Sequence, residues 1–179
     1  MVLGDGLVVI VDDDDQVAVE FGGIVEALKR QAARKRAVAN DGDDVVTIGG
    51  TTHSSVYLGG GNDILEITGN ADQNIDAGTG NDTIAVKGHV NGYIDLAAGG
   101  DTLYTSDYVN GIIFAGEGND SVILGGYIKN DVRGGSGADS IELTKYSKID
   151  WDTNKDGVKD KVQEFENIKF SDGTIIGNL

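Results

Sequence analysis

The sequence predicts an all-β fold, a right-handed parallel β-solenoid (a β-roll) of six coils that follow one another along a single axis. The first observation is a fixed spacing, because six aspartates lie 19 residues apart without an insertion. They are Asp44, Asp63, Asp82, Asp101, Asp120 and Asp139. The second is that a glycine precedes each aspartate by two residues and an aliphatic residue follows each by two, as Gly80 and Ile84 do around Asp82. A fixed period of this length is the signature of a solenoid.

Each 19-residue repeat has room for two short strands and two turns. After Asp82, the apolar residues Ile84 and Val86 are two positions apart, which is the period of a strand. A second apolar column lies twelve residues after each aspartate and includes Ile94 and Ile113. β-Branched residues of this kind suit a pleated surface. We therefore expect the apolar residues of residues 41–152 to stack inward on their copies, so that contacts between neighbouring coils stabilise the fold.

The aspartates of successive coils are expected to form a column, because stacked strands lie about 4.8 Å apart. Two carboxylates about 5 Å apart repel by about 3 kcal/mol at an effective dielectric of about 20. The column therefore needs protons or cations between its members. Oxygen ligands in a flexible arrangement suit Ca²⁺ better than Mg²⁺. Zn²⁺ is disfavoured, since the sequence has no cysteine and His53 and His89 fall at different positions of the repeat.

The glycine turns resemble the nonapeptide of RTX-type (hemolysin-type) Ca²⁺-binding β-rolls. Residues 134–142, Gly-Gly-Ser-Gly-Ala-Asp-Ser-Ile-Glu, match it in full, and residues 77–85 and 115–123 match with alanine at the first position. RTX rolls usually carry such a turn on both sides of each coil, whereas this chain carries it on one side. The 19-residue form is similar to the Ca²⁺-dependent ice-binding region of a giant marine bacterial adhesin.

The resemblance implies Ca²⁺ ions between adjacent turns, held by the aspartates and by carbonyl oxygens of the glycine turns. Six stacked turns leave gaps for about five ions in one row. The ligands predicted in the roll are Asp44, Gly61, Asp63, Gly80, Asp82, Gly99, Asp101, Gly118, Asp120, Gly137 and Asp139.

Composition limits the partners and the compartment. The formal net charge is −16, which excludes nucleic acid as a partner. There is no cysteine, so no disulfide contributes to stability. The longest apolar run near the start, residues 7–11, is too short to span a membrane, and we expect no membrane insertion. We expect a monomer that is secreted or lies on the surface of a bacterium, as the RTX resemblance implies.

Residues 1–40 precede the roll and are expected to cap its first coil. Residues 7–11 and 17–21 are predicted to form strands, and residues 24–38 a helix with Val25 and Leu28 on one face. The open end of a solenoid exposes its core and unpaired strand groups, so it needs such a cap. Five basic residues in the predicted helix leave a second interpretation open, a patch that binds an acidic polysaccharide or an anionic surface.

Residues 153–179 are expected to leave the 19-residue register and to cap the other end. At the junction, four oxygen-bearing residues have the spacing of an EF-hand loop with a glycine at its sixth position. They are Asp152, Asn154, Asp156 and Asp160. Two interpretations of this loop are open, one further Ca²⁺ site and a simple polar turn. Residues 174–176 are then predicted to pair with residues 168–170 in a hairpin that covers the last coil.

The sequence thus predicts a Ca²⁺-binding, RTX-like module of a secreted or cell-surface bacterial protein. Such a module folds when Ca²⁺ binds and serves as a structural, adhesin or accessory module. We see no pair of nucleophile and base in the repeats, so we expect no catalysis by this chain itself.

Two alternatives to this function are open. The first is the accessory module of a secreted polysaccharide-modifying enzyme, similar to the C-terminal modules of mannuronan epimerases. It would hold a polysaccharide or a cell-surface glycan along the tyrosines of the middle coils, which are Tyr93, Tyr104, Tyr108 and Tyr127. The second and less favoured alternative is ice binding. The threonine column of the adhesin region holds one threonine here, Thr79, in six positions, and Glu117 lies in the same column.

Overall fold

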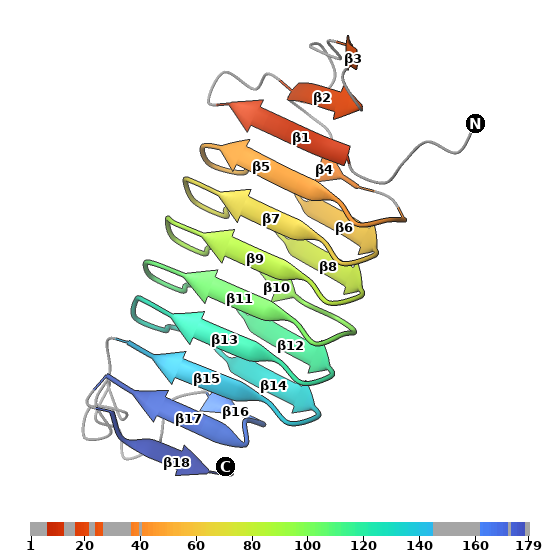
Figure 1. Ribbon diagram of the computed structural model, residues 1–179. Coiled ribbons are helices and arrows are strands. Elements are labelled where there is room, and N and C mark those ends of the chain that lie inside the picture. Colours follow the sequence, from red (N-terminus) through yellow and green to blue (C-terminus); the bar gives the residue numbers. More distant parts are fainter. Residues whose placement is uncertain are drawn as a thin grey trace.

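The computed structural model describes residues 7–12, 17–21, 24–26, 37–39, 41–144, 162–171 and 173–177. Over these residues the chain forms two sheets that run side by side along one axis, with the N-terminal strands at one end and the C-terminal strands at the other (Figure 1). No helix occurs in these residues, and therefore none that is long and apolar enough to cross a membrane. The fold class predicted from the repeat, an all-β parallel solenoid, is confirmed.

The first sheet contains 11 strands and the second contains seven. In chain order, the first is made of β1 (Leu7–Asp12), β2 (Val17–Phe21), β3 (Ile24–Glu26), β5 (Val45–Gly49), β7 (Ile64–Ile67), β9 (Thr83–Val86), β11 (Thr102–Thr105), β13 (Ser121–Leu124), β15 (Ser140–Leu143), β17 (Asn167–Phe170) and β18 (Ile175–Gly177). The second is made of β4 (Ala37–Val38), β6 (Val56–Gly60), β8 (Ile75–Thr79), β10 (Ile94–Asp95), β12 (Ile113–Glu117), β14 (Val132–Ser136) and β16 (Val162–Gln163).

Neighbouring coils pair in parallel and keep the register of the sequence repeat. Ile84, for example, pairs with Leu65 on one side and Leu103 on the other, each 19 residues away. Six strands of the first sheet, from β5 to β15, alternate along the chain with five of the second, from β6 to β14, and together they form five complete turns. The second half of the predicted sixth coil falls largely in residues 145–161, outside the described residues.

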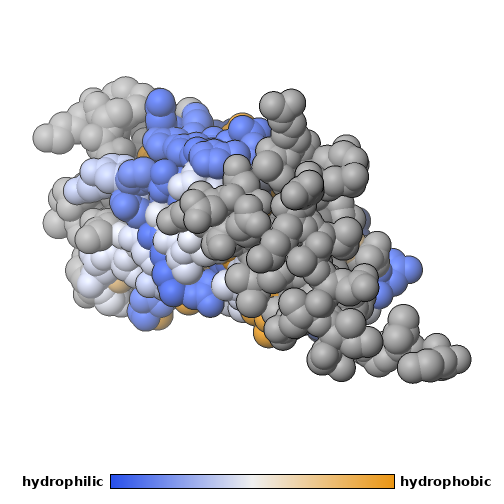
Figure 2. Space-filling model, turned by 90° about the horizontal axis from the view of Figure 1, so that it is seen from above, coloured by the Kyte–Doolittle hydropathy of each residue, from blue (hydrophilic) through white to orange (hydrophobic). Residues whose placement is uncertain are grey.

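The core lies between the two sheets and is built from the predicted apolar columns. In β7 and β9, alternate residues are buried, so that Leu65, Ile67, Ile84 and Val86 have no exposed surface. The opposite sheet contributes its own column of buried side chains, such as Ile94. The outward positions are polar for the most part, and Figure 2 shows the described surface seen from above as largely hydrophilic, with hydrophobic residues in small separate areas.

The N-terminal segment extends the solenoid, and the predicted helix over residues 24–38 is wrong at both of its ends. Residues 24–26 form β3, which pairs antiparallel with β2, and residues 37–38 form β4, which pairs with β6 at the repeat offset of 19. Residues 27–36 lie outside the described residues. Phe21 pairs with Ile24 across Gly22-Gly23, a typical hairpin sequence, so strand pairing overrides the helical pattern. The strands predicted at residues 7–11 and 17–21 are confirmed as β1 and β2.

The C-terminal hairpin is also confirmed, since β18 pairs antiparallel with β17. Residues 162–170, which were expected to lie outside the repeat, instead add one more strand to each sheet. β16 pairs with β14 and β17 pairs with β15, both in parallel. Phe165, Ile168 and Phe170 are buried there and complete the core. The loop residues Asp152, Asn154, Asp156 and Asp160 lie outside the described residues.

The invariant glycine column has a steric cause. Gly80 has a φ of 122°, and a Cβ built on it would lie 1.9 Å from the carbonyl oxygen of Gly61 in the preceding coil. A neighbouring column, which includes Gly78 and Gly116, also has positive φ, but its third coil carries Ala97 with a φ of 68°. β10 ends before Ala97 and spans two residues, whereas its neighbours β8 and β12 span five.

We expect Gly80→Ala to lower the free energy of unfolding more than Gly42→Ala. Both glycines have φ near +120°, where another residue costs about 1–3 kcal/mol. Only at Gly80 would the new Cβ also meet the preceding coil, because a Cβ at Gly42 has nothing within 4 Å. That contact should add about 1–3 kcal/mol. Urea unfolding of both variants in one buffer measures the difference, and equal losses would contradict a steric origin for the column.

Candidate metal site along the glycine turns

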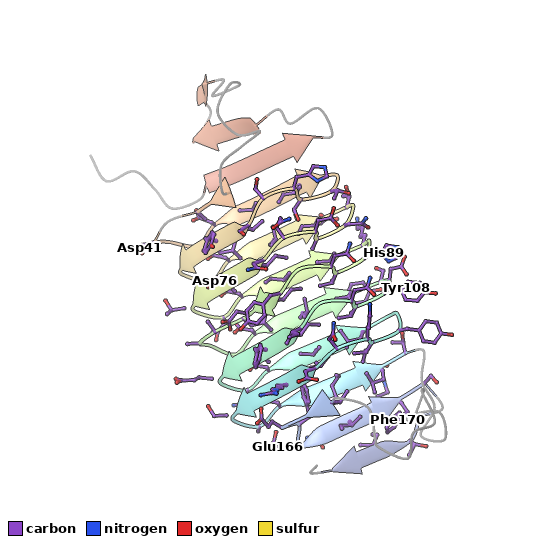
Figure 3. All side chains as sticks on the ribbon, turned by 180° about the vertical axis from the view of Figure 1, so that it is seen from behind. Asp41, Asp76, His89, Tyr108, Glu166 and Phe170 are labelled. Carbon is purple, nitrogen blue, oxygen red and sulfur yellow. The ribbon has the colours of Figure 1, made fainter. Side chains whose placement is uncertain are left out.

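The six repeated aspartates lie where each glycine turn enters a strand of the first sheet, with their side chains turned inward. Their exposed fractions range from 0% at Asp139 to 5% at Asp44, and the other four expose 2% or less. The glycine turns form one edge of the solenoid, marked in Figure 3 by Asp41 and Glu166. His89 and Tyr108 mark the opposite edge. The structure therefore brings the predicted aspartates together in one buried column, and the predicted glycines lie beside it at partly or fully exposed positions of the turns.

Each repeated aspartate downstream of Asp44 accepts a hydrogen bond from the backbone of the coil before it. The N–H of Asp82 donates to Oδ1 of Asp101 at 2.7 Å, and the same bond recurs in every gap between the repeats, at 2.7 or 2.8 Å. A carboxylate that accepts a backbone N–H forms a charge-assisted hydrogen bond, which is stronger than a neutral one. One oxygen of each carboxylate downstream of Asp44 is thus used to join neighbouring coils.

The second oxygen of these carboxylates has no such partner in the part of the chain that the structure describes. There, Oδ2 is buried and forms no hydrogen bond in five aspartates, which are Asp63, Asp82, Asp101, Asp120 and Asp139. A buried carboxylate without compensation is costly, and real proteins satisfy it with a proton, a paired charge or a metal ion. Among the described residues, no lysine or arginine forms an ion pair with these five aspartates.

Burial also raises the pKa values of five aspartates in the column. Burial raises the pKa of Asp82 to about 6 and that of Asp101 to about 7, from an ordinary value of 3.8. The hydrogen bond from the neighbouring backbone lowers each pKa in part, and the adjacent carboxylates raise it again. Burial is also the largest cause of the raised pKa of Asp63, Asp120 and Asp139. In the middle of the column, protons and cations therefore compete for these carboxylates between about pH 6 and about pH 7.

The donor set fits a hard divalent cation. The unpartnered atoms are carboxylate oxygens, the ligands that Ca²⁺ and Mg²⁺ prefer. Within the described residues, no three acidic, histidine or cysteine side chains converge on one point. Further ligands would therefore be backbone carbonyl oxygens, and Ca²⁺ accepts them in irregular arrangements more readily than Mg²⁺ does.

A second polar column lies outside the first and fixes the shape of the turns. Oδ1 of Asp43 accepts the backbone N–H of Asn62, and Oδ1 of Asn62 accepts that of Asn81. Asn81 and Asn119 accept the N–H of the next coil in the same way. Asparagine at this position thus has a structural role, which the sequence pattern alone did not reveal.

The sequence analysis missed one member of the aspartate column. The N–H of Asp139 donates to Oε2 of Glu166, so Glu166 occupies the place that the next aspartate would hold. A signal for it exists in the sequence, because Glu166, Ile168 and Phe170 repeat the alternation of Asp139, Ile141 and Leu143. The 27-residue offset between them hides it from a search at a period of 19.

This architecture defines a class of protein, the parallel β-solenoids in which a column of buried carboxylates follows one edge. Within it, residues 131–179 match the family described as the bacterial antifreeze protein repeat. The chain is also similar to the solved structure of a hyperactive, Ca²⁺-dependent, β-helical antifreeze protein from an Antarctic bacterium. The TM-score is 0.66 and the identity 27%, over 80% of this chain and 53% of that one.

The chain therefore spans about half the length of the antifreeze structure. No curated protein is significantly similar to it. The resemblance predicted from the sequence, to a 19-residue, Ca²⁺-dependent ice-binding repeat, is confirmed as a similarity of both sequence and fold.

We expect the metal-free protein to become more stable as the pH falls from about 8 to about 5. The folded-state pKa values of Asp82 and Asp101 lie above the unfolded value, so the folded state binds more protons in this range. Stability is then lost as the pH rises through about 6 to 7, by about 1.4 kcal/mol for each unit of pKa shift. Thermal melts in excess chelator across this range measure it. Stability that rises with pH would contradict the assignment.

Proposed function

We propose that the chain is a Ca²⁺-binding module of a bacterial protein and that it folds when the ions bind. The observation that carries the proposal is the column of five buried Oδ2 atoms that have no hydrogen-bond partner among the described residues. The similarity to an antifreeze protein that is itself Ca²⁺-dependent supports it. In this reading the five gaps between the six repeated aspartates hold about five ions.

The proposed coupling follows from electrostatics. Without cations, the folded state must bury carboxylates that repel one another or take up protons. Ca²⁺ neutralises them as carboxylates, with the turn carbonyl oxygens as further ligands. Because the unfolded chain has no preformed site, the binding free energy of each ion adds to the free energy of folding. Outside a cell, where Ca²⁺ is abundant, the roll would be closed. We therefore place the module in a secreted or surface protein, where it acts as a structural or adhesive element rather than as a catalyst.

The relationship to an antifreeze protein raises ice binding as a role for the exposed positions of the glycine turns. Thr79 and Asn81 are exposed there, but Glu117 is exposed in the column of Thr79. A charged, strongly hydrated side chain interrupts a face that would have to order water regularly. The asparagine oxygens next to it also accept backbone N–H groups. We therefore propose a structural role for this face rather than ice binding.

A second candidate function, glycan binding, is favoured by the opposite edge. Tyr108 and Tyr127 are 45% and 52% exposed and lie with ring centroids 5.5 Å apart, and His89 packs on Tyr108 at 5.4 Å. Beside them, the amide of Asn110 donates to Oδ1 of Asn91. Aromatic rings with one polar atom and side-chain amides are suited to the apolar faces and hydroxyl groups of sugars. A polysaccharide with no net charge fits the acidic surroundings best.

Calcium should raise both the β-sheet signal and the melting temperature, and Mg²⁺ should do so much less. Far-UV circular dichroism and thermal melts in excess chelator, and then across a titration of each ion, measure the effect. A protein that is equally folded and stable in chelator and in Ca²⁺ would contradict the proposed function.

The variant Asp82→Asn separates the two roles of the column. Its amide oxygen can still accept the N–H of Asp63, but the charge is gone. We expect it to be more stable than the natural protein in chelator and to gain less from Ca²⁺. Asp107→Asn is the control, because Asp107 is half exposed and lies at the other edge. An equal response of the two variants would contradict a special role for Asp82.

Two measurements on the Ca²⁺-loaded protein distinguish the surface roles. A glycan array with the natural protein and a Tyr108→Ala, Tyr127→Ala double variant should show binding of uncharged polysaccharides that the variant loses. Thermal hysteresis should not exceed that of a control protein of equal size. Hysteresis well above the control would instead assign ice binding to the glycine-turn face, and an empty array would remove the glycan candidate.

A further inference from the structure

The last coil has a shortened glycine turn. Arg133 pairs with Gln163 and Ser140 pairs with Asn167, so that residues 134–139 of one coil correspond to residues 164–166 of the next. Six residues are thus matched by three. Glu164, in this short turn, has a φ of 63° and is one of two residues other than glycine with positive φ among those described.

Glu166 compensates for the short turn. Its carboxylate accepts the backbone N–H of Asp139, as an aspartate does in each earlier gap. The additional methylene of glutamate lengthens the side chain, so that a carboxylate can reach the preceding coil from a turn with three fewer residues. The carboxylate column therefore continues into the C-terminal cap and ends at Glu166.

The coil before this turn has a glycine, Gly134, against which two oxygen atoms of the junction lie closely. A Cβ built on Gly134 would lie 2.8 Å from Oδ2 of Asp139 and 1.9 Å from the carbonyl oxygen of Glu164. The corresponding positions of the earlier coils are filled by buried side chains, which are Leu58, Ala77, Leu96 and Ala115. Asp139 is fully buried, and its Oδ2, which lies beside Gly134, has no hydrogen-bond partner among the described residues.

We propose that Asp139, Glu166 and the carbonyl oxygen of Glu164 bind one Ca²⁺ ion at the junction of the roll and its C-terminal cap. The two carboxylates balance the charge of one divalent cation, and the carbonyl adds a third oxygen of the kind that Ca²⁺ accepts. This site is additional to those between the repeats and rests on the proposed function, in that it takes the same ion. Its ligands come from both sides of the junction, so the ion holds β17 and β18 on the roll.

The described ion pairs do not involve the two carboxylates. Among the described residues, Lys169 of the last coil pairs with Glu142 on the exposed face, and no basic side chain forms an ion pair with Asp139 or Glu166. A bound ion at this site would compensate both carboxylates.

The test is the number of Ca²⁺ ions bound per chain, counted by native mass spectrometry, together with hydrogen exchange of the β17 and β18 amides. Glu166→Gln keeps a side-chain oxygen for the N–H of Asp139 and removes the charge. We expect it to bind one ion fewer than the natural protein and to exchange faster in β17 and β18. Glu164→Gln is the matched control, because its side chain is exposed and only its carbonyl is used, and it should keep the full count.

The outcomes separate this site from the proposed function. If Glu166→Gln binds as many ions as the natural protein, the terminal site is wrong while the repeated sites stand. If the natural protein binds no Ca²⁺, both proposals fall. If Glu166→Gln does not fold, Glu166→Asp is the second variant, because it keeps the charge on a side chain too short to reach the preceding coil. A full count of bound ions in Glu166→Asp, with unchanged hydrogen exchange in β17 and β18, would overturn the site.

Discussion

The structure depends on one constraint: every coil must place a carboxylate inside the protein, against the backbone of the coil before it. One oxygen of this carboxylate accepts a backbone N–H, as Asp101 does from Asp82, and thereby fixes the register between coils. In the five repeated aspartates after Asp44, the other oxygen has no hydrogen-bond partner among the described residues. The same carboxylate that aligns the coils therefore leaves a buried charge to be compensated, so folding and ion binding are coupled. The glycines serve this arrangement, because only they let the turns approach so closely.

The two edges of the solenoid have different roles, since one stabilises the fold and the other presents exposed aromatic side chains. The glycine edge holds the buried carboxylates and, outside them, asparagines such as Asn81 whose oxygens bind the next coil. The oxygens that bind neighbouring coils are therefore not available to an external partner. The opposite edge carries exposed aromatic rings, including Tyr108 and Tyr127. A partner that binds the folded module would therefore meet this second edge without disturbing the ion column.

The repeated part of the fold could be predicted from the sequence because, in a solenoid, residues one repeat apart in sequence pair with each other in neighbouring coils. The columns of Asp82 and Gly80 and the alternation of Ile84 and Val86 needed no further information. The ends could not be predicted in this way. The hairpin at Gly22-Gly23 overrides a helical pattern, and the shortened turn before Glu166 breaks the period that revealed the rest. The inward orientation and hydrogen bonds of the aspartates likewise depend on the three-dimensional turn.

The strict register also limits how such a chain can change length during evolution. Inserting one residue into a strand of the roll would turn every following side chain to the other face and separate the two polar columns. Inserting or deleting a whole coil leaves every contact type intact, since each coil meets only its neighbours. The roll can thus grow or shrink in steps of 19 residues. At the C-terminal junction the offset is different, because Glu166 follows Asp139 by 27 residues. The ends are the places where new segments can be added without disturbing what lies between them.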